Sequence, residues 1–167
     1  MEKIIQSKAV LLSDNIDTDQ IYPGRFLALV DPKEIGSHCF EGADGVNRDM
    51  VPGSIVVAGT NFGCGSSREH AVICLINADV KAVVAESFAR IFFRNAINLG
   101  LPLITCKGIS QKAKLGQTLT VDMDAGTVTI QETGEVIPSE KLGDHVLKII
   151  EAGGIKPLFR AKISKNT

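Results

Sequence analysis

Three short apolar runs, separated by helix-length stretches, constrain the fold of this chain most strongly. They span residues 54–59, 80–85 and 103–105. Short runs of this kind are typical of buried strands, and both intervals between them carry helical spacing of apolar residues. The alternation of strand and helix, with a hairpin signal later in the chain, predicts an α/β domain. We expect a single domain that covers residues 1–167.

The boundaries of the other elements follow from capping and turn residues. A strand is expected over residues 8–12, and a loop over residues 41–53. Asp31 and Pro32 predict a helix start, and Asp124-Ala125-Gly126 predicts a hairpin turn. The remaining expected elements are a helix from Ser66 or Ser67 to Ile76, a helix capped by Ser87 and ended by Gly100 and Pro102, strands over 118–123 and 127–131, and a last helix over 140–152.

The charge balance argues against nucleic-acid and membrane partners. The chain has 18 basic and 19 acidic residues, a net charge of −1, so no basic excess favours phosphate backbones or anionic lipids. No apolar run is long enough to span a bilayer, and the first residues show no signal-peptide pattern. We therefore expect a cytoplasmic protein.

The four cysteines are widely spaced and include no C-x-x-C pair. A zinc site or an iron–sulfur site made by this chain alone is therefore not expected. In the cytoplasm these cysteines would be reduced thiols. Any cluster that the activity needs would have to come from a partner.

The segment richest in chemistry is Gly63-Cys64-Gly65-Ser66-Ser67-Arg68-Glu69-His70, between a predicted strand and a predicted helix. Free N–H groups and the helix dipole favour an anion at such a junction, and arginine can hold a carboxylate through two hydrogen bonds. The structural alternative is that a serine only caps the helix and the glycines only allow a tight turn. A dinucleotide fingerprint fits poorly, because Arg68 occupies the third glycine position.

The string from Asn61 to Ala71 resembles the signature of the aconitase swivelling domain, closest to small subunits of isopropylmalate dehydratases and homoaconitases. Residues 14–21 are similar to the N-terminal turn of that family, and residues 86–95 to its second helix. The resemblance covers nearly the whole chain. It implies a three-layer β/β/α fold with a partly parallel central sheet.

The resemblance also implies a function, the dehydration and rehydration of hydroxy acids related to malate. Ser66 would be the general base, and Ser67 and Arg68 would bind a substrate carboxylate. Asp19 would orient a histidine of a separate large subunit, which would carry a 4Fe–4S cluster and form a heterodimer or heterotetramer with this chain. A serine alkoxide needs positive potential, which a helix N-terminus beside Arg68 would provide.

Substrate choice in this family depends on a loop that here contains Phe26, Leu27, Ala28 and Leu29. Homoaconitase-like sequences tend to have arginine where Ala28 stands, so this apolar loop favours an alkyl substituent. We expect 3-isopropylmalate as substrate. The small subunits of 2,3-dimethylmalate dehydratase and homoaconitase remain alternatives, and the direction of Arg25 is open.

Two interpretations from other classes stay open at this level. One is a non-catalytic anion- or nucleotide-binding module, and the other is a thiol enzyme that uses Cys64, which a helix N-terminus would activate. Glu69 and His70 are expected to brace the helix start. Arg90 and Arg94 share a helix face and are expected to lie on a solvated face or in a subunit contact.

Overall fold

A computed structural model of the chain describes every residue except 1–2, 44–45, 47–49 and 166–167. A seven-stranded sheet runs through it in the order β4-β3-β2-β1-β5-β6-β7. Strands β1 to β4 pair in parallel, and β1 pairs with β5, β5 with β6 and β6 with β7 in antiparallel register. The strands are β1 (Ile4–Leu11), β2 (Ile55–Ala58), β3 (Ala82–Ala85), β4 (Leu103–Thr105), β5 (Thr118–Asp122), β6 (Thr127–Ile130) and β7 (Glu135–Pro138).

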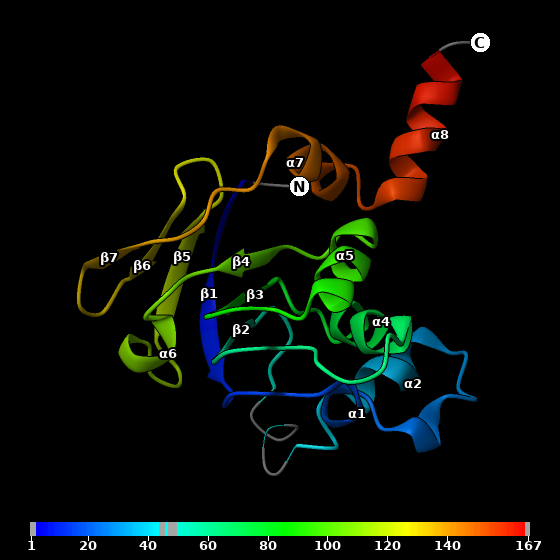
Figure 1. Cartoon of the computed structure of the whole chain (residues 1–167), viewed down its shortest axis with the longest axis horizontal. Helices are drawn as coiled ribbons and strands as arrows, with labels where there is room; N and C mark the ends of the chain where they lie inside the picture. The colour runs from blue at the N-terminus through cyan, green and yellow to red at the C-terminus, as the bar shows by residue number, and fades with distance from the viewer. Residues whose placement is uncertain (1–2, 44–45, 47–49, 166–167) are drawn as a thin grey trace.

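The sheet curls, so that its parallel and antiparallel halves share one apolar core. We call this the inner core, and it takes Val57 from β2 and Val84 from β3, together with Val121 from β5 and Val128 from β6. Successive side chains of a strand point to opposite faces, which explains why Val56, beside Val57, belongs to a different core. Two sheet layers and one helical layer result, so the predicted three-layer β/β/α arrangement is confirmed (Figure 1).

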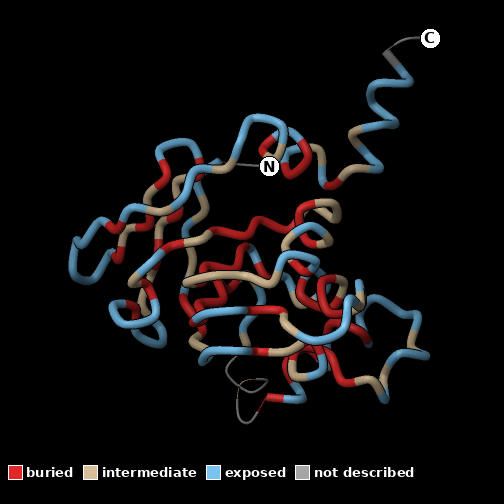
Figure 2. The backbone as a smooth tube through the Cα atoms, viewed as in Figure 1, coloured by how far each residue is buried: buried red, intermediate tan, exposed pale blue. Residues whose placement is uncertain are grey.

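Helices cover the other face of the parallel half and form the outer core with Val56, Val83 and Leu103 (Figure 2). Leu75 of α4 and Phe92 of α5 are members of this core. The helices are α1 (Thr18–Ile21), the 3₁₀ helix η1 (Gly24–Phe26), α2 (Pro32–Ser37), α4 (Glu69–Asn77), α5 (Arg90–Asn98), α6 (Ile109–Lys112), α7 (Asp144–Glu151) and α8 (Ile155–Lys165).

Several predicted elements are confirmed, including the hairpin of β5 and β6 and the helix start at Asp31, whose carboxylate accepts from Lys33 N at 3.2 Å. The loop expected over 41–53 has turns at 41–42 and 52–53, whereas 44–45 and 47–49 lie outside the described residues. The first strand begins earlier than predicted, because the stretch from Ile4 to Lys8 pairs with β5.

Three predicted helix boundaries are wrong. The helix expected over 140–152 is α7, which begins only at Asp144, because Glu140 N donates to Thr105 O at 2.8 Å. Helix α8, which follows α7, was not predicted. Ser87 is not the cap of α5, which begins at Arg90, because the stretch from 87 to 89 runs beside Phe62 in an extended bridge.

Helix α4 begins at Glu69, not at Ser66 or Ser67. Its N-cap residue is Arg68, which has extended dihedral angles (φ −74°, ψ 122°) and makes no side-chain capping bond. The first-turn N–H groups of α4 therefore have no side-chain cap.

Candidate active site

Two of the three segments that carry the family resemblance, residues 14–21 and 61–71, lie side by side at one end of the sheet. They follow β1 and β2, which are parallel neighbours, and the carboxyl ends of such strands meet at one edge. Asp17 and Cys64 form a parallel bridge, in which Thr18 N donates to Cys64 O at 2.9 Å. Gly63 N donates to Ile16 O at 2.8 Å. These bonds fix the turn after β1 against the turn after β2.

Gly63 and Gly65 give the second turn its shape. Both have positive φ, +84° and +98°, which L side chains rarely adopt. A Cβ on Gly63 would also lie 2.2 Å from Cγ of Phe92, so only glycine fits between the turn and α5. The turn therefore packs directly on α5, and the residues after Gly65 reach the surface beside α1.

Ser66 is exposed, but its hydroxyl is held by a buried side chain. Its Oγ lies 3.1 Å from Oγ1 of Thr18, which belongs to the N-terminal turn and is only 3% exposed. Sequence reasoning did not select Thr18. Its place between Asp17 and Asp19 in the N-terminal motif is the signal that could have identified it.

Asp19 and Arg68 form an ion pair across the same junction. Arg68 Nη1 donates to Asp19 Oδ1 at 3.2 Å, and the same oxygen accepts from Gly24 N at 2.9 Å. With side chains 36% and 68% exposed, the pair contributes little to stability, but it orients the guanidinium. Neither bond uses Oδ2 of Asp19.

Ser66, Ser67 and Arg68 line one cavity of about 340 Å³ that opens between the glycine turn and α5. From α5, Arg90, Ile91 and Asn95 also line it, and Asn95 Nδ2 donates to Ser67 O at 3.5 Å. The structure thus brings together the predicted serines and Arg68, with the Arg68 partner Asp19 beside them.

The predicted specificity loop does not line this cavity in the isolated chain. Leu27 and Ala28 are exposed, whereas Phe26 and Leu29 pack against the outer core. Phe26 stacks on His38 with ring centroids 3.8 Å apart. Arg25 turns away from the cavity, with its guanidinium 4.6 Å from the Phe26 ring centroid and 3.7 Å from Glu41.

The other side chains near the helix start have packing partners or are open to solvent. His70 stacks on Tyr22 with centroids 6.2 Å apart, in agreement with a bracing role, and Glu69 is exposed in the first turn of α4. Cys64 is partly exposed, whereas Cys39, Cys74 and Cys106 are buried. Burial raises the pKa of the Cys106 thiol to about 11, so this buried thiol stays protonated near neutral pH.

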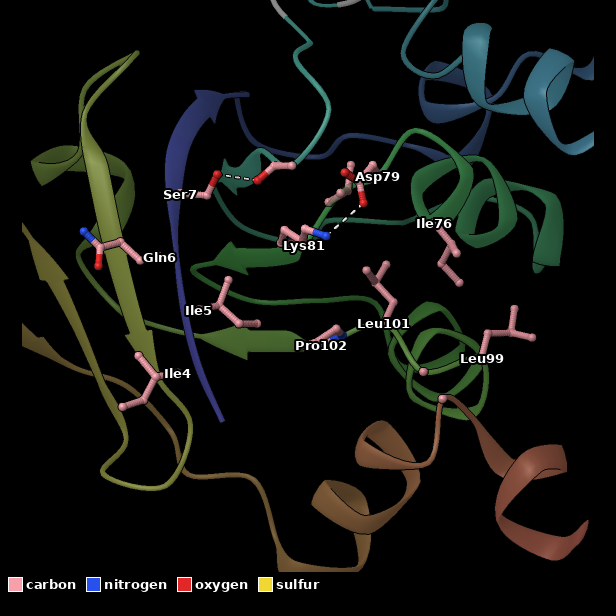
Figure 3. A pocket seen from close by; sticks show the side chains of 14 residues that line it. Ile4, Ile5, Gln6, Ser7, Ile76, Asp79, Lys81, Leu99, Leu101 and Pro102 are labelled. Atoms are coloured by element: carbon pink, nitrogen blue, oxygen red, sulfur yellow. Dashed lines mark hydrogen bonds and ion pairs between the residues drawn. The ribbon is translucent and has the colours of Figure 1, made fainter. Parts of the chain in front are cut away.

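A larger cavity, of about 630 Å³, lies elsewhere, between β1 and the ends of α4 and α5 (Figure 3). Its lining is mostly apolar, and its charged lining residues are Asp79 and Lys81, which pair with each other at 3.0 Å. It offers no uncompensated charge or exposed nucleophile among its described lining residues. The cavity at Ser66 brings together Ser66, Ser67 and Arg68 of the predicted motif, and for this reason it is the candidate active site.

Among the described residues, no three His, Cys, Asp or Glu side chains are grouped so that they could hold a metal ion. This part of the chain provides no ligand set for an iron–sulfur cluster. In the same residues, no helix is long and apolar enough to cross a membrane.

Comparisons with known proteins identify the family of the chain. The aconitase C-terminal domain family matches residues 48–108, which include the glycine turn and α4. The small subunit of isopropylmalate/citramalate isomerase from Methanocaldococcus jannaschii is 46% identical over 167 residues, 99% of each chain. 3-Isopropylmalate dehydratase small subunit 1 from Methanopyrus kandleri is 48% identical over 161 residues, 96% of this chain and 95% of that one.

A solved structure agrees as well. The crystal structure of 3-isopropylmalate dehydratase from M. jannaschii superposes with a TM-score of 0.91 at 39% identity, covering 98% of this chain and 99% of that chain. The resemblance and the fold expected from the sequence are thus confirmed, and a small subunit implies a large-subunit partner. The chain belongs to the family of 3-isopropylmalate dehydratase small subunits, the smaller components of aconitase-type hydro-lyases.

Proposed function

We propose that this chain works with a large subunit to interconvert 3-isopropylmalate and 2-isopropylmalate by dehydration and rehydration, a step of leucine biosynthesis. The whole chain forms one domain in this proposal. The observation that carries the proposal is the convergence of Ser66, Ser67 and Arg68 on one small cavity, with Thr18 on Ser66 and Asp19 on Arg68. The printed names of the relatives from M. jannaschii and M. kandleri support the substrate.

Ser66 is the general base in this proposal and takes the proton from the carbon next to a substrate carboxylate. A serine hydroxyl is a weak base, so the alkoxide needs stabilisation. Thr18 can donate a hydrogen bond to Ser66 Oγ, and Arg68 and the uncapped first turn of α4 place positive potential nearby. The proton that Ser66 gains in dehydration is returned to carbon in rehydration.

Ser67 and Arg68 bind the substrate carboxylate. The Arg68 guanidinium is held at one end by Asp19 and lines the cavity, which leaves other N–H donors for two parallel bonds to a carboxylate. Asp19 thus has a positioning role within this chain. Its second oxygen, Oδ2, is available to orient a histidine of the large subunit.

The large subunit carries the 4Fe–4S cluster in this proposal, because the described part of this chain has no ligand set for it. Bound there, the cluster would supply a Lewis acid for the departing hydroxyl group. The two chains form a heterodimer or heterotetramer. We place the complex in the cytoplasm, where the four cysteines would stay reduced thiols.

The apolar loop of Phe26, Leu27, Ala28 and Leu29 favours an alkyl substituent over a third carboxylate. Leu27 and Ala28 are exposed in the isolated chain and become available to substrate when the large subunit closes the cavity. A methyl-substituted malate is a second candidate, supported by the name of the M. jannaschii relative, which includes citramalate. Isopropylmalate has two more methylene units than citramalate, and each methylene changes binding by only about 1–3 kcal/mol, so an apolar loop accepts both.

Reconstitution tests this function. The chain is mixed anaerobically with its cognate large subunit, and kcat/KM is measured for 3-isopropylmalate, citramalate, 2,3-dimethylmalate and homoaconitate. Activity should require both chains and be highest with an alkyl-substituted malate. A preference for homoaconitate would contradict the substrate, and full turnover by this chain alone would contradict the division of the site between subunits.

A further inference from the structure

Two arginines on α5 have no acidic partner in the described part of the chain. Arg90 and Arg94 lie one helical turn apart and are both exposed. The described ion pairs include Arg68 with Asp19 and Arg25 with Glu41, but none involves α5. The α5 face therefore carries two uncompensated positive charges.

These guanidinium groups border a cavity of about 610 Å³ between α5 and α7. Its walls are largely apolar, and Phe88 and Phe93 pack there with ring centroids 5.8 Å apart. Glu140 also lines it, yet forms no ion pair with either arginine. The remaining lining residues are Ser87, Ile97, Asn98, Thr105, His145, Val146 and Ile149.

This surface is continuous with the candidate active site. Arg90 lines both the cavity at Ser66 and the cavity between α5 and α7. Ile91, which also lines the first cavity, is 56% exposed, a large apolar side chain open to solvent. Exposed aliphatic and aromatic groups beside arginine are typical of the centre of a protein interface.

We propose that the α5 face, defined by Phe88, Arg90, Ile91, Phe93 and Arg94, is a docking surface for the large subunit. The occupant is an apolar segment of that subunit with carboxylates placed to pair with Arg90 and Arg94. This inference rests on the proposed function, in which the cavity at Ser66 is completed by the large subunit. A large subunit that closes the cavity at Ser66 from the α5 side would contact Arg90, which also lines the cavity between α5 and α7.

A protein occupant fits better than a small carboxylate bound between α5 and α7. The apolar and cationic groups extend across two cavities and include the exposed Ile91, which a small ligand between α5 and α7 would leave uncovered. A protein surface covers all of these groups at once and provides the missing negative charges. Guanidinium–carboxylate pairs also fix the orientation of docking.

The test is the affinity of Arg94→Glu for the cognate large subunit. Arg94 lines only the second of the two cavities, so its substitution leaves the cavity at Ser66 intact. The dissociation constant is measured anaerobically by titration calorimetry, and independently as the concentration of small subunit that gives half-maximal activity. Lys114→Glu is the matched control, because Lys114 is exposed two residues after α6, a helix that packs on β2 and β3 and not on α5, and the change of charge is the same.

Arg94→Glu should weaken binding by at least about tenfold, because it sets a negative charge against the partner's carboxylates. The kcat at saturating small subunit should stay within about twofold of wild type, and Lys114→Glu should bind normally. Arg94→Gln, which removes the charge without reversing it, should give a smaller loss and a weaker dependence of affinity on salt. Thermal unfolding of the isolated variants should match wild type, since the side chain is exposed.

Wild-type affinity of Arg94→Glu would overturn the docking surface and leave the proposed function untouched. Binding of a small carboxylate to the isolated chain, lost in Arg94→Glu while subunit affinity is kept, would also overturn it. If instead the wild-type subunits assemble but turn over no malate, the proposed function fails, while a loss of affinity in Arg94→Glu still supports the surface.

Discussion

The hydroxyl oxygens of Thr18 and Ser66 lie 3.1 Å apart, although 48 positions separate the two residues in the sequence. Thr18 is buried in the first turn of α1, and Ser66 is exposed just after the glycine turn. The contact therefore ties the residue proposed as base to a rigid point of the fold. It also explains why the N-terminal turn and the glycine turn must meet for the site to exist.

Thr18→Val should lower kcat of the assembled enzyme by about 2- to 10-fold with little change in KM. The substitution keeps the shape of the side chain but removes a hydrogen bond of about 0.5–1.5 kcal/mol to Ser66. Thr18→Ser, which keeps the hydroxyl, should retain most of the activity. Steady-state kinetics of both variants check this, and an equal fall in both would point to packing instead of the hydrogen bond.

Gly63→Ala should lower the free energy of unfolding by about 2–5 kcal/mol. A Cβ at this position would lie 2.2 Å from the Phe92 ring, and the positive φ adds a further cost for any L residue. Gly116 is the matched control, because it has a similar φ of +82°, but a Cβ added there would meet no atom within 4 Å. Gly116→Ala should cost only about 1–2 kcal/mol.

Urea unfolding of the two alanine variants separates the cost of the contact with Phe92 from the cost of a positive φ. A similar loss of stability in Gly63→Ala and Gly116→Ala would show that the contact with Phe92 relaxes without cost. A larger loss for Gly63→Ala would support close packing of the turn on α5 as the reason for glycine there.

Ala28→Arg should shift specificity from 3-isopropylmalate towards homoaconitate by about tenfold or more in the ratio of kcat/KM values. A guanidinium at this position would meet the additional carboxylate of homoaconitate and would be unpaired beside an isopropyl group. Val30→Arg is the control, because Val30 is 87% exposed just outside the loop. An equal shift in both variants would mean that the added charge acts at long range.

Glu86 makes stability depend on pH below neutrality. Burial raises the pKa of its carboxyl group, but hydrogen bonds from Gly108 N at 2.7 Å, Ser110 N at 2.8 Å and Ser110 Oγ at 2.9 Å outweigh burial and leave the pKa below its ordinary value. A lowered pKa in the folded state stabilises the fold above the unfolded-state pKa, and this contribution is lost as the pH falls through the folded-state pKa.

Glu86→Gln should therefore be less stable than wild type at pH 7, by about 1 kcal/mol or more. The difference should shrink as the pH falls through the acidic range in which Glu86 of wild type becomes protonated. Unfolding by urea at a series of pH values measures it. A difference that stays constant down to low pH would mean that the carboxylate charge makes no contribution.

The arrangement of the parallel strands could be predicted from local pattern, because short apolar runs and helical spacing are properties of neighbouring residues. The start of α4 could not. Serine is a common cap, yet Ser66 lies outside the helix, where its hydroxyl contacts Thr18, a residue far away in the sequence. Long-range contacts override local propensity at this point, which is also the proposed site.

Residues of the site could be predicted where they lie in a sequence motif with a recognisable chemical role. Ser66, Ser67 and Arg68 lie in one string, and the structure adds their shared cavity and the Asp19 partner. Thr18 was missed, although it lies in the N-terminal motif, because the motif alone does not show that its hydroxyl contacts Ser66. Strand β7 and helix α8 were missed as well, since the short β7 is mostly exposed and α8 has little buried apolar surface.

The most direct measurement is kcat of Ser66→Ala in the complex with the large subunit, beside Arg68→Lys and Cys64→Ala. Ser66→Ala should lower kcat on the order of 10²-fold or more without weakening assembly, because it removes the proton-transfer group. Arg68→Lys should mainly raise KM through loss of bidentate carboxylate binding, and Cys64→Ala should do less harm than either. If Ser66→Ala kept its kcat while Cys64→Ala abolished turnover, the assignment of Ser66 as base would be contradicted.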